Sequence, residues 1–121
     1  MPLRTLIVDD NASFRTAART ILDGPEFRVV GEAASAGEAL RRAEELDPEI
    51  ILLDIDLGED SGFAVARRLS ARIDGAGAKL IMISIHPEER FADLIAESPA
   101  VGFLAKSDLA PYRLAELLRD R

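Results

Sequence analysis

The feature that most constrains this chain is a set of five short, uninterrupted apolar runs, at residues 6–8, 29–30, 50–53, 80–83 and 101–104. A strand with one face in water alternates apolar and polar residues, whereas a strand covered on both faces is apolar throughout. The runs are therefore typical of a parallel sheet that has helices on each side.

Helical periodicity occupies the intervals between these runs. Apolar residues recur at spacings of three and four in residues 14–22, 36–43, 91–95 and 114–118, and more weakly at Ala66, Leu69 and Ile73. Strands that alternate with amphipathic helices predict an α/β fold of the (βα)5 type with right-handed crossovers.

Capping and helix-breaking residues predict where the helices begin and end. Residues 75–77, Gly-Ala-Gly, predict a loop before the fourth strand. The expected boundary residues are Asn11 and Asp23 for the first helix, Asp47 for the second, Pro87 for the start of the fourth, and Ser107 or Asp108 for the start of the last.

The composition argues against several classes of protein. The 121 residues fit one domain, and 48% of them are hydrophobic, which is enough for a buried core. No apolar stretch is long enough to cross a membrane, and the amino terminus lacks the pattern of a signal peptide. The absence of cysteine suits a cytoplasmic protein. A net charge of −7 argues against direct binding of nucleic acid and favours a basic partner or a cation.

Polar side chains follow the strand runs at the points where ligands bind in open α/β sheets. They are Asp9 and Asp10, Asp54 and Asp56, Ser84, and Lys106. Three acids at one point repel one another, and a hard cation such as Mg²⁺ would remove that cost. A lysine and a hydroxyl can hold phosphoryl oxygens, so the set predicts phosphoryl transfer to a carboxylate.

Four segments resemble the signature sequences of response-regulator receiver domains, which act in two-component signalling. They read LIVDDN from residue 6, ILLDIDLGEDSGF from residue 51, LIMISIH from residue 80 and VGFLAKSDL from residue 101. The SIH and AKSDL forms are most similar to the LuxR-type subfamily, also called NarL/FixJ-like. The resemblance implies a flavodoxin-like, doubly wound sandwich with a five-stranded parallel sheet of order 2-1-3-4-5.

The resemblance also implies roles for single residues. Asp54 matches the aspartate that accepts the phosphate, and Lys106 matches the lysine that contacts the phosphoryl group. Ser84 matches the hydroxyl that hydrogen-bonds a phosphoryl oxygen. Phe103 lies at the position of the aromatic residue that rearranges on activation.

The cofactor implied by the resemblance is Mg²⁺. Asp10 and Asp54 match its direct ligands, and Asp9 would act directly or through water. The backbone carbonyl of Asp56 matches the third protein ligand.

The partners implied are a sensor histidine kinase as phosphoryl donor and a DNA-binding output domain beyond residue 121. The expected output is transcription regulation, through a changed surface at residues 91–97, 101–105 and 108–119. A phosphorylation-dependent homodimer is expected at that surface or through the first and last helices.

Other interpretations of the same residues remain open. Asp54-Ile-Asp56 also resembles the nucleophile motif of haloacid-dehalogenase-like phosphatases, although there the motif follows the first strand. A receiver-like module that works by protein contact without phosphorylation is a second alternative, and a flavin-binding flavodoxin-like protein is a third. Each polar residue could also be an ordinary solvated strand end, and Phe103 could serve packing alone.

The chain departs from many receivers at several positions. Ser107 replaces a proline that is often joined by a cis bond, and Gly58 should loosen the loop after Asp54. Ile85 replaces a small residue and could narrow access to the acceptor. Asp56 adds a carboxylate near the metal. His86 is expected to be a loop residue rather than a catalyst.

Overall fold

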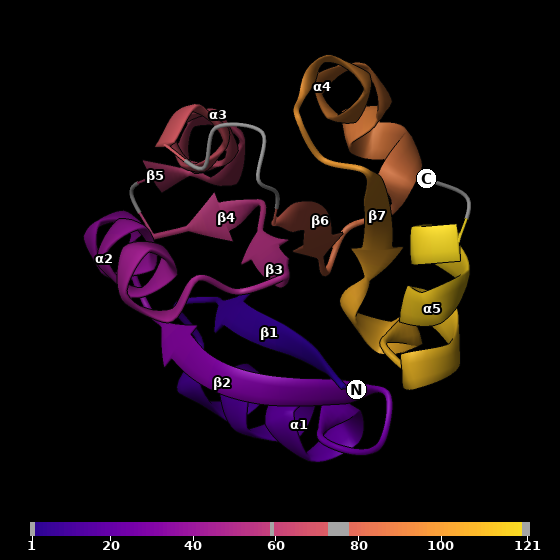
Figure 1. The fold of residues 1–121 in the computed structure, drawn as a ribbon. Coiled ribbons are helices and arrows are strands. Elements are labelled where there is room, and N and C mark those ends of the chain that lie inside the picture. Colours follow the sequence, from indigo (N-terminus) through magenta and orange to yellow (C-terminus); the bar gives the residue numbers. More distant parts are fainter. Residues whose placement is uncertain (1, 59, 73–77, 120–121) are drawn as a thin grey trace.

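The computed structural model describes residues 2–58, 60–72 and 78–119. Its parallel sheet has the order β2-β1-β3-β6-β7, which is the predicted order 2-1-3-4-5 when the strands of this sheet are numbered along the chain. The strands are β1 (Leu3–Val8), β2 (Phe27–Ala33), β3 (Ile50–Asp54), β6 (Lys79–Ser84) and β7 (Gly102–Ala105). The predicted (βα)5, flavodoxin-like architecture is confirmed (Figure 1).

Helices cover both faces of the sheet (Figure 1). α1 (Ala12–Leu22) and α5 (Pro111–Arg119) pack on one face, and α2 (Ala36–Leu46), α3 (Gly62–Arg72) and α4 (Ala92–Glu97) pack on the other. Two short 3-10 turns, η1 (Glu88–Phe91) and η2 (Lys106–Asp108), precede α4 and α5. None of the described helices has both the length and the apolar character that a membrane span needs.

The apolar runs are continuous because each central strand contributes to two cores. On β3, Ile51 and Leu53 belong to the core under α2 and α3, while Ile50 and Leu52 belong to the core under α1 and α5. Successive side chains of a strand point to opposite faces, so every position must be apolar when both faces are covered. β1 and β6 divide their residues between the cores in the same way.

Most of the expected helix boundaries are confirmed. The Asn11 side chain accepts a hydrogen bond from the backbone N–H of Phe14 at 3.1 Å and caps α1. Asp23 and Asp47 are the C-cap residues of α1 and α2, and Asp47 has a left-handed φ of 47°. Ile73 and the predicted loop at residues 75–77 lie outside the described residues.

Three local features differ from the predictions, and the geometry of one peptide bond, which the sequence left open, is defined by the structure. The fourth helix does not start at Pro87, because Pro87 leads into η1 and α4 begins only at Ala92. Neither Ser107 nor Asp108 caps the last helix, because both lie in η2 and α5 starts at Pro111. The peptide bond that joins Lys106 to Ser107 is trans. Finally, β4 (Asp56–Leu57) and β5 (Asp60–Ser61) form a small antiparallel hairpin that the sequence pattern did not predict.

Candidate functional site

Three carboxylates meet at the carboxyl ends of β1 and β3, and we call Asp9, Asp10 and Asp54 the acid cluster. One oxygen from each side chain lies within 4.8 Å of the oxygens of the other two. Asp9 is fully buried and Asp54 is 5% exposed, whereas Asp10 is exposed. The predicted acids are therefore brought together with two of their three side chains buried rather than on an open surface.

Asp9 is held by hydrogen bonds to its backbone N–H and to one of its two carboxylate oxygens. Its backbone N–H donates to the carbonyl of Ala33 at 3.0 Å, and its Oδ1 accepts from the backbone N–H of Asn11 at 2.8 Å. Among the described residues, Oδ2 has no well-directed hydrogen bond. It lies 2.6 Å from Nζ of Lys106, so its contact is an ion pair.

Lys106, which follows β7, reaches the acid cluster with its side chain. Its Nζ is 2.6 Å from Oδ2 of Asp9 and 3.3 Å from Oδ2 of Asp54. Nζ also lies 4.5 Å from the centre of the Phe14 ring, a cation–π contact. Burial alone lowers the pKa of Lys106, but the contacts with the two acids outweigh it, and the pKa lies above its usual value. The lysine is thus a cation that partly neutralises the acid cluster.

Asp54 ends β3 with its side chain almost covered. Its Oδ1 accepts a hydrogen bond from the backbone N–H of Asp56 at 3.1 Å, and its Oδ2 contacts Lys106. Burial raises the pKa of Asp54 to about 6, with a smaller contribution from the charge of Asp9, although the Asp56 hydrogen bond and Lys106 oppose it. The carboxylate is therefore still mainly ionised at pH 7, which a nucleophile requires.

Two glycines lie close to residues of the acid cluster. A Cβ atom on Gly62, the first residue of α3, would lie 2.1 Å from the carbonyl oxygen of Asp54 and 2.7 Å from Cα of Ile55. Gly58 has a φ of +59°, and a Cβ there would lie 3.7 Å from Oδ2 of Asp10. Sequence reasoning missed Gly62. The signal was a glycine directly after Asp60-Ser61, at the predicted junction between loop and helix.

The remaining predicted residues lie on β4, at or just after the end of β6, and on β7. Ser84 is 1% exposed and directly follows Ile83, the register partner of Asp54, and its Oγ accepts from the backbone N–H of His86 at 3.0 Å. Phe103 is 8% exposed and packs in the core on the α3 and α4 side. Ile85 is 75% exposed, so its side chain stands at the surface beside Ser84. Asp56 is exposed in β4.

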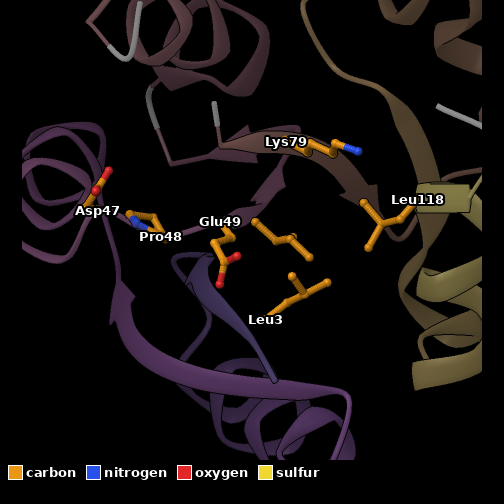
Figure 2. A pocket seen from close by; sticks show the side chains of 7 residues that line it. Leu3, Asp47, Pro48, Glu49, Lys79 and Leu118 are labelled. Atoms are coloured by element: carbon orange, nitrogen blue, oxygen red, sulfur yellow. The ribbon is translucent and has the colours of Figure 1, made fainter. Parts of the chain in front are cut away.

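A hollow lies at the end of the sheet opposite the acid cluster (Figure 2). Leu3, Ile50 and Lys79, which line it, are the first residues of β1, β3 and β6. Asp47, Pro48, Glu49 and Leu118 complete its wall. It contains none of the predicted site residues, and ligands of open α/β sheets bind at the opposite, carboxyl ends of the strands.

The donors of the acid cluster fit a hard divalent cation. All are carboxylate oxygens, which Mg²⁺ prefers, and the buried Oδ2 of Asp9 lacks a directed hydrogen bond within the described part of the chain. Clustered acids are common without a metal, but the ammonium group of Lys106 offsets only part of the negative charge of three neighbouring carboxylates. The residues could therefore hold a metal ion.

Comparisons with known proteins agree with this geometry. Residues 5–119 match the sequence model of the family described as the response regulator receiver domain. The chain is 33% identical over 116 residues to a putative transcriptional regulator of Pseudomonas aeruginosa, covering 95% of this chain and 53% of that protein. It is 29% identical over 120 residues to the nitrate/nitrite response regulator protein NarL of Escherichia coli, covering 98% of this chain and 54% of that protein. The chain spans about half the length of these curated relatives.

A solved structure shows the same similarity. The LuxR-family two-component response regulator from Aurantimonas has a TM-score of 0.82 and 31% sequence identity, over 99% of this chain and 84% of that one. The family match spans nearly the whole sequence, and the relatives and the solved structure agree with it on both sequence and fold. The chain therefore belongs to the response-regulator receiver domains of two-component systems, and it is similar to members of the LuxR and NarL type.

Proposed function

We propose that this domain is a phosphorylation switch in which Asp54 accepts a phosphoryl group from a phosphohistidine of a sensor histidine kinase. The observation that carries the proposal is the buried Asp54 carboxylate, which contacts the ammonium group of Lys106 and lies within 4.8 Å of carboxylate oxygens of Asp9 and Asp10. An oxygen of Asp54 attacks phosphorus, the bond from phosphorus to the histidine nitrogen breaks, and the nitrogen keeps the electron pair. The product is an aspartyl phosphate.

The surrounding residues have separate roles in this proposal. Lys106 holds a phosphoryl oxygen by charge, and the hydroxyl of Ser84 donates a hydrogen bond to another. Asp9, Asp10, Asp54 and the backbone carbonyl of Asp56 hold Mg²⁺. When bound, Mg²⁺ supplies positive charge that offsets the charge of the phosphoryl oxygens.

The acceptor assignment is tested by intact-mass measurement after incubation with Mg²⁺ and acetyl phosphate or a phosphorylated kinase. The wild type should gain one phosphoryl group, and Asp54→Asn should gain none. Asp56→Asn, which removes the exposed carboxylate two residues away, is the matched control and should still be labelled. Equal labelling of Asp54→Asn would refute the assignment, and steady hydrolysis of small phosphomonoesters would favour a phosphatase.

The output of the switch is proposed to be the surface formed by residues 91–97, 101–105 and 108–119. Phosphate on Asp54 would draw Ser84 inward, and Phe103 would turn toward the space beside β7. The route is short, because η1 begins four residues after Ser84 and Ala105 pairs with Ser84 across the sheet. A coupling of about 1–3 kcal/mol would change partner affinity about 5- to 150-fold.

The expected readout is homodimerisation at this surface or through α1 and α5. Amide exchange with and without beryllofluoride should show changes at α4, β7 and α5. Changes limited to the acid cluster would overturn this route, and they would favour a module that signals without phosphorylation.

Binding of DNA is proposed to belong to a separate domain of a longer protein, beyond residue 121. This domain has a net charge of −7, whereas DNA-binding surfaces are basic. The relative from Pseudomonas aeruginosa is named a putative transcriptional regulator and is about twice as long as the part that matches. Salt-sensitive, micromolar binding of duplex DNA by residues 1–121 would contradict the proposal.

A further inference from the structure

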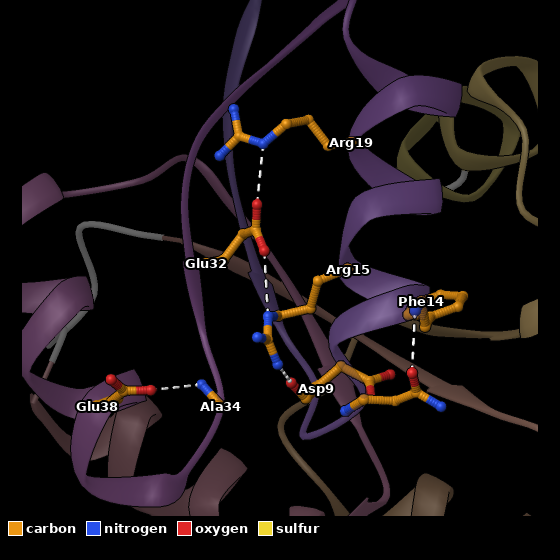
Figure 3. Close-up of polar contacts among 8 residues, drawn as sticks. Asp9, Phe14, Arg15, Arg19, Glu32, Ala34 and Glu38 are labelled. Atoms are coloured by element: carbon orange, nitrogen blue, oxygen red, sulfur yellow. Dashed lines mark hydrogen bonds and ion pairs between the residues drawn. The ribbon is translucent and has the colours of Figure 1, made fainter.

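A polar network joins β2 to α1 and ends at the acid cluster (Figure 3). The carboxylate of Glu32, in β2, forms ion pairs with two arginines of α1. Its Oε1 lies 3.1 Å from Nε of Arg15, and its Oε2 lies 2.9 Å from Nε of Arg19. Each arginine also donates from Nη1 to a backbone carbonyl. Arg15 reaches the carbonyl of Asp9 at 2.7 Å, and Arg19 reaches that of Val29 at 3.3 Å.

We infer that Arg15, oriented by Glu32, is a positioning residue that sets the Asp9 and Asp10 carboxylates for Mg²⁺. The inference rests on the proposed function, because it concerns the same metal site. The carbonyl of Asp9 and the N–H of Asp10 belong to one planar peptide unit. A hydrogen bond that holds this carbonyl therefore restrains the backbone from which both side chains project.

Within the described part of the chain, the other hydrogen bonds of Asp9 do not hold this peptide unit by its carbonyl. β1 ends at Val8, so the carbonyl of Asp9 lies beyond the ladder of the parallel sheet. The hydrogen bonds from Asp9 to Ala33 and from Asn11 to Asp9 hold the backbone N–H and the side chain of Asp9, but not its carbonyl. The guanidinium of Arg15 supplies that contact, and the side chains of Arg15 and Glu32 are only 19% and 27% exposed.

The role of Arg15 is a matter of geometry rather than of charge. A positive side chain near a Mg²⁺ site repels the ion, so its charge alone would weaken binding. Its planar fork, however, can hold Glu32 and the Asp9 carbonyl at once, which an ammonium group does less well. Outer contacts that orient metal ligands commonly matter for metal affinity. The two effects have opposite signs, so they can be separated by experiment.

The chain itself offers a matched control for this experiment. Arg15→Met and Arg19→Met each remove one charge and one ion pair with Glu32, but only Arg15→Met releases the Asp9 carbonyl. Arg15→Lys keeps the charge and loses the fork. The measurement is the Kd of Mg²⁺ for the whole 121-residue domain by calorimetry, at about 0.15 M salt to screen distant charges. Thermal unfolding without Mg²⁺ reports the structural cost of each change.

Arg15→Met and Arg15→Lys should raise the Kd roughly tenfold, which is the lower end of the effect of losing an outer contact. Arg19→Met should leave the Kd within about twofold of the wild type. It should nevertheless lower the melting temperature about as much as Arg15→Met does, because each variant loses one ion pair with Glu32. If either Arg15 variant fails to fold, Glu32→Gln loosens the same arginine and should raise the Kd about threefold.

Equal Kd values for Arg15→Met and Arg19→Met would overturn the inference while leaving the proposed function intact. A Kd for Arg15→Lys like that of the wild type would also overturn it, because the planar fork of the guanidinium would then not be needed. A wild type that binds no Mg²⁺ would refute the metal site itself, and the inference with it.

Discussion

The acid cluster and the segment made of η1 and α4 both follow strand ends, but they are anchored very differently. Asp9 and Asp54 are buried and tied to neighbouring backbone by hydrogen bonds of 2.8 and 3.1 Å. The segment at residues 88–97 has no fully buried residue, and Leu94 is 48% exposed. Phe91 meets Phe63 at a ring distance of 6.2 Å and packs only partly against the core.

This difference assigns the two regions different physical tasks. A site for chemistry must hold its groups in place before the reaction, because ordering them during the reaction costs free energy. A surface that reports on the site must move at low cost, so it is drawn from weakly packed parts of a fold. By comparison, α2 has four buried residues, whereas α4 has none.

The largest effect on stability is expected at Gly62, where α3 begins against the backbone of Asp54 and Ile55. Gly62→Ala should lower the free energy of unfolding by about 3 kcal/mol or more, because the new Cβ overlaps backbone atoms that cannot turn away. Gly37→Ala is the matched control, since a Cβ there meets nothing within 4 Å. The control should stabilise the protein by about 0.5–1 kcal/mol, as for glycine in a helix. Urea unfolding measures the stability of both variants. A Gly62→Ala variant as stable as the wild type would show that the backbone at Asp54 and Ile55 can move to accommodate a Cβ atom.

A pair of leucines compares α3 directly with α4. Leu69 is 1% exposed, and Leu69→Ala should cost about 2–5 kcal/mol of stability. Leu94 is about half exposed, and Leu94→Ala should change stability by less than about 0.5 kcal/mol. Chemical denaturation of the two variants is the measurement. Similar losses would mean that α4 is as firmly anchored as α3, and the comparison would fail.

The acid cluster should also make the stability of the metal-free protein depend on pH. The pKa of Asp54 is raised from 3.8 to about 6, so between these values the folded state binds a proton that the unfolded state has lost. Stability should therefore fall as the pH rises from about 4 to about 6, by at most roughly 3 kcal/mol.

Denaturation curves across that pH range test this point. Asp54→Asn should lose this part of the pH dependence. Asp93→Asn, which removes one carboxylate from α4 instead, is the control and should keep it. Wild-type and Asp54→Asn profiles of the same shape would argue against a strongly buried carboxylate.

The smallest effect is expected for the ring that packs on Lys106. Phe14→Leu keeps an apolar side chain but removes the cation–π contact, and it should cost about 0.5–1 kcal/mol. In the double variant with Lys106→Met, the effect of Phe14→Leu should be smaller. A double-mutant cycle of unfolding free energies measures the coupling, and a coupling of zero would mean that the contact adds no stability.

The sequence alone was enough to predict the five strands of the parallel sheet and the convergence of the acids, and the resemblance to receiver domains implied the order of those strands. The alternation of Ile50, Ile51, Leu52 and Leu53 between two cores is a local pattern, because neighbouring residues of a strand always face opposite ways. Asp9 and Asp54 come together because parallel strands all end at one edge of the sheet. The cap at Asn11 was likewise predictable, since its partner is three residues away.

Only the tertiary structure decided the contacts between residues far apart in the chain. The pairing of Lys106 with Asp9, the overlap that excludes a side chain at Gly62, and the link from Glu32 through Arg15 to the Asp9 carbonyl join separate elements. The structure also placed the start of α4 at Ala92 and that of α5 at Pro111, after the 3-10 turns η1 and η2. Periodicity and capping report interactions within about four residues, whereas these distances depend on how whole strands and helices pack together.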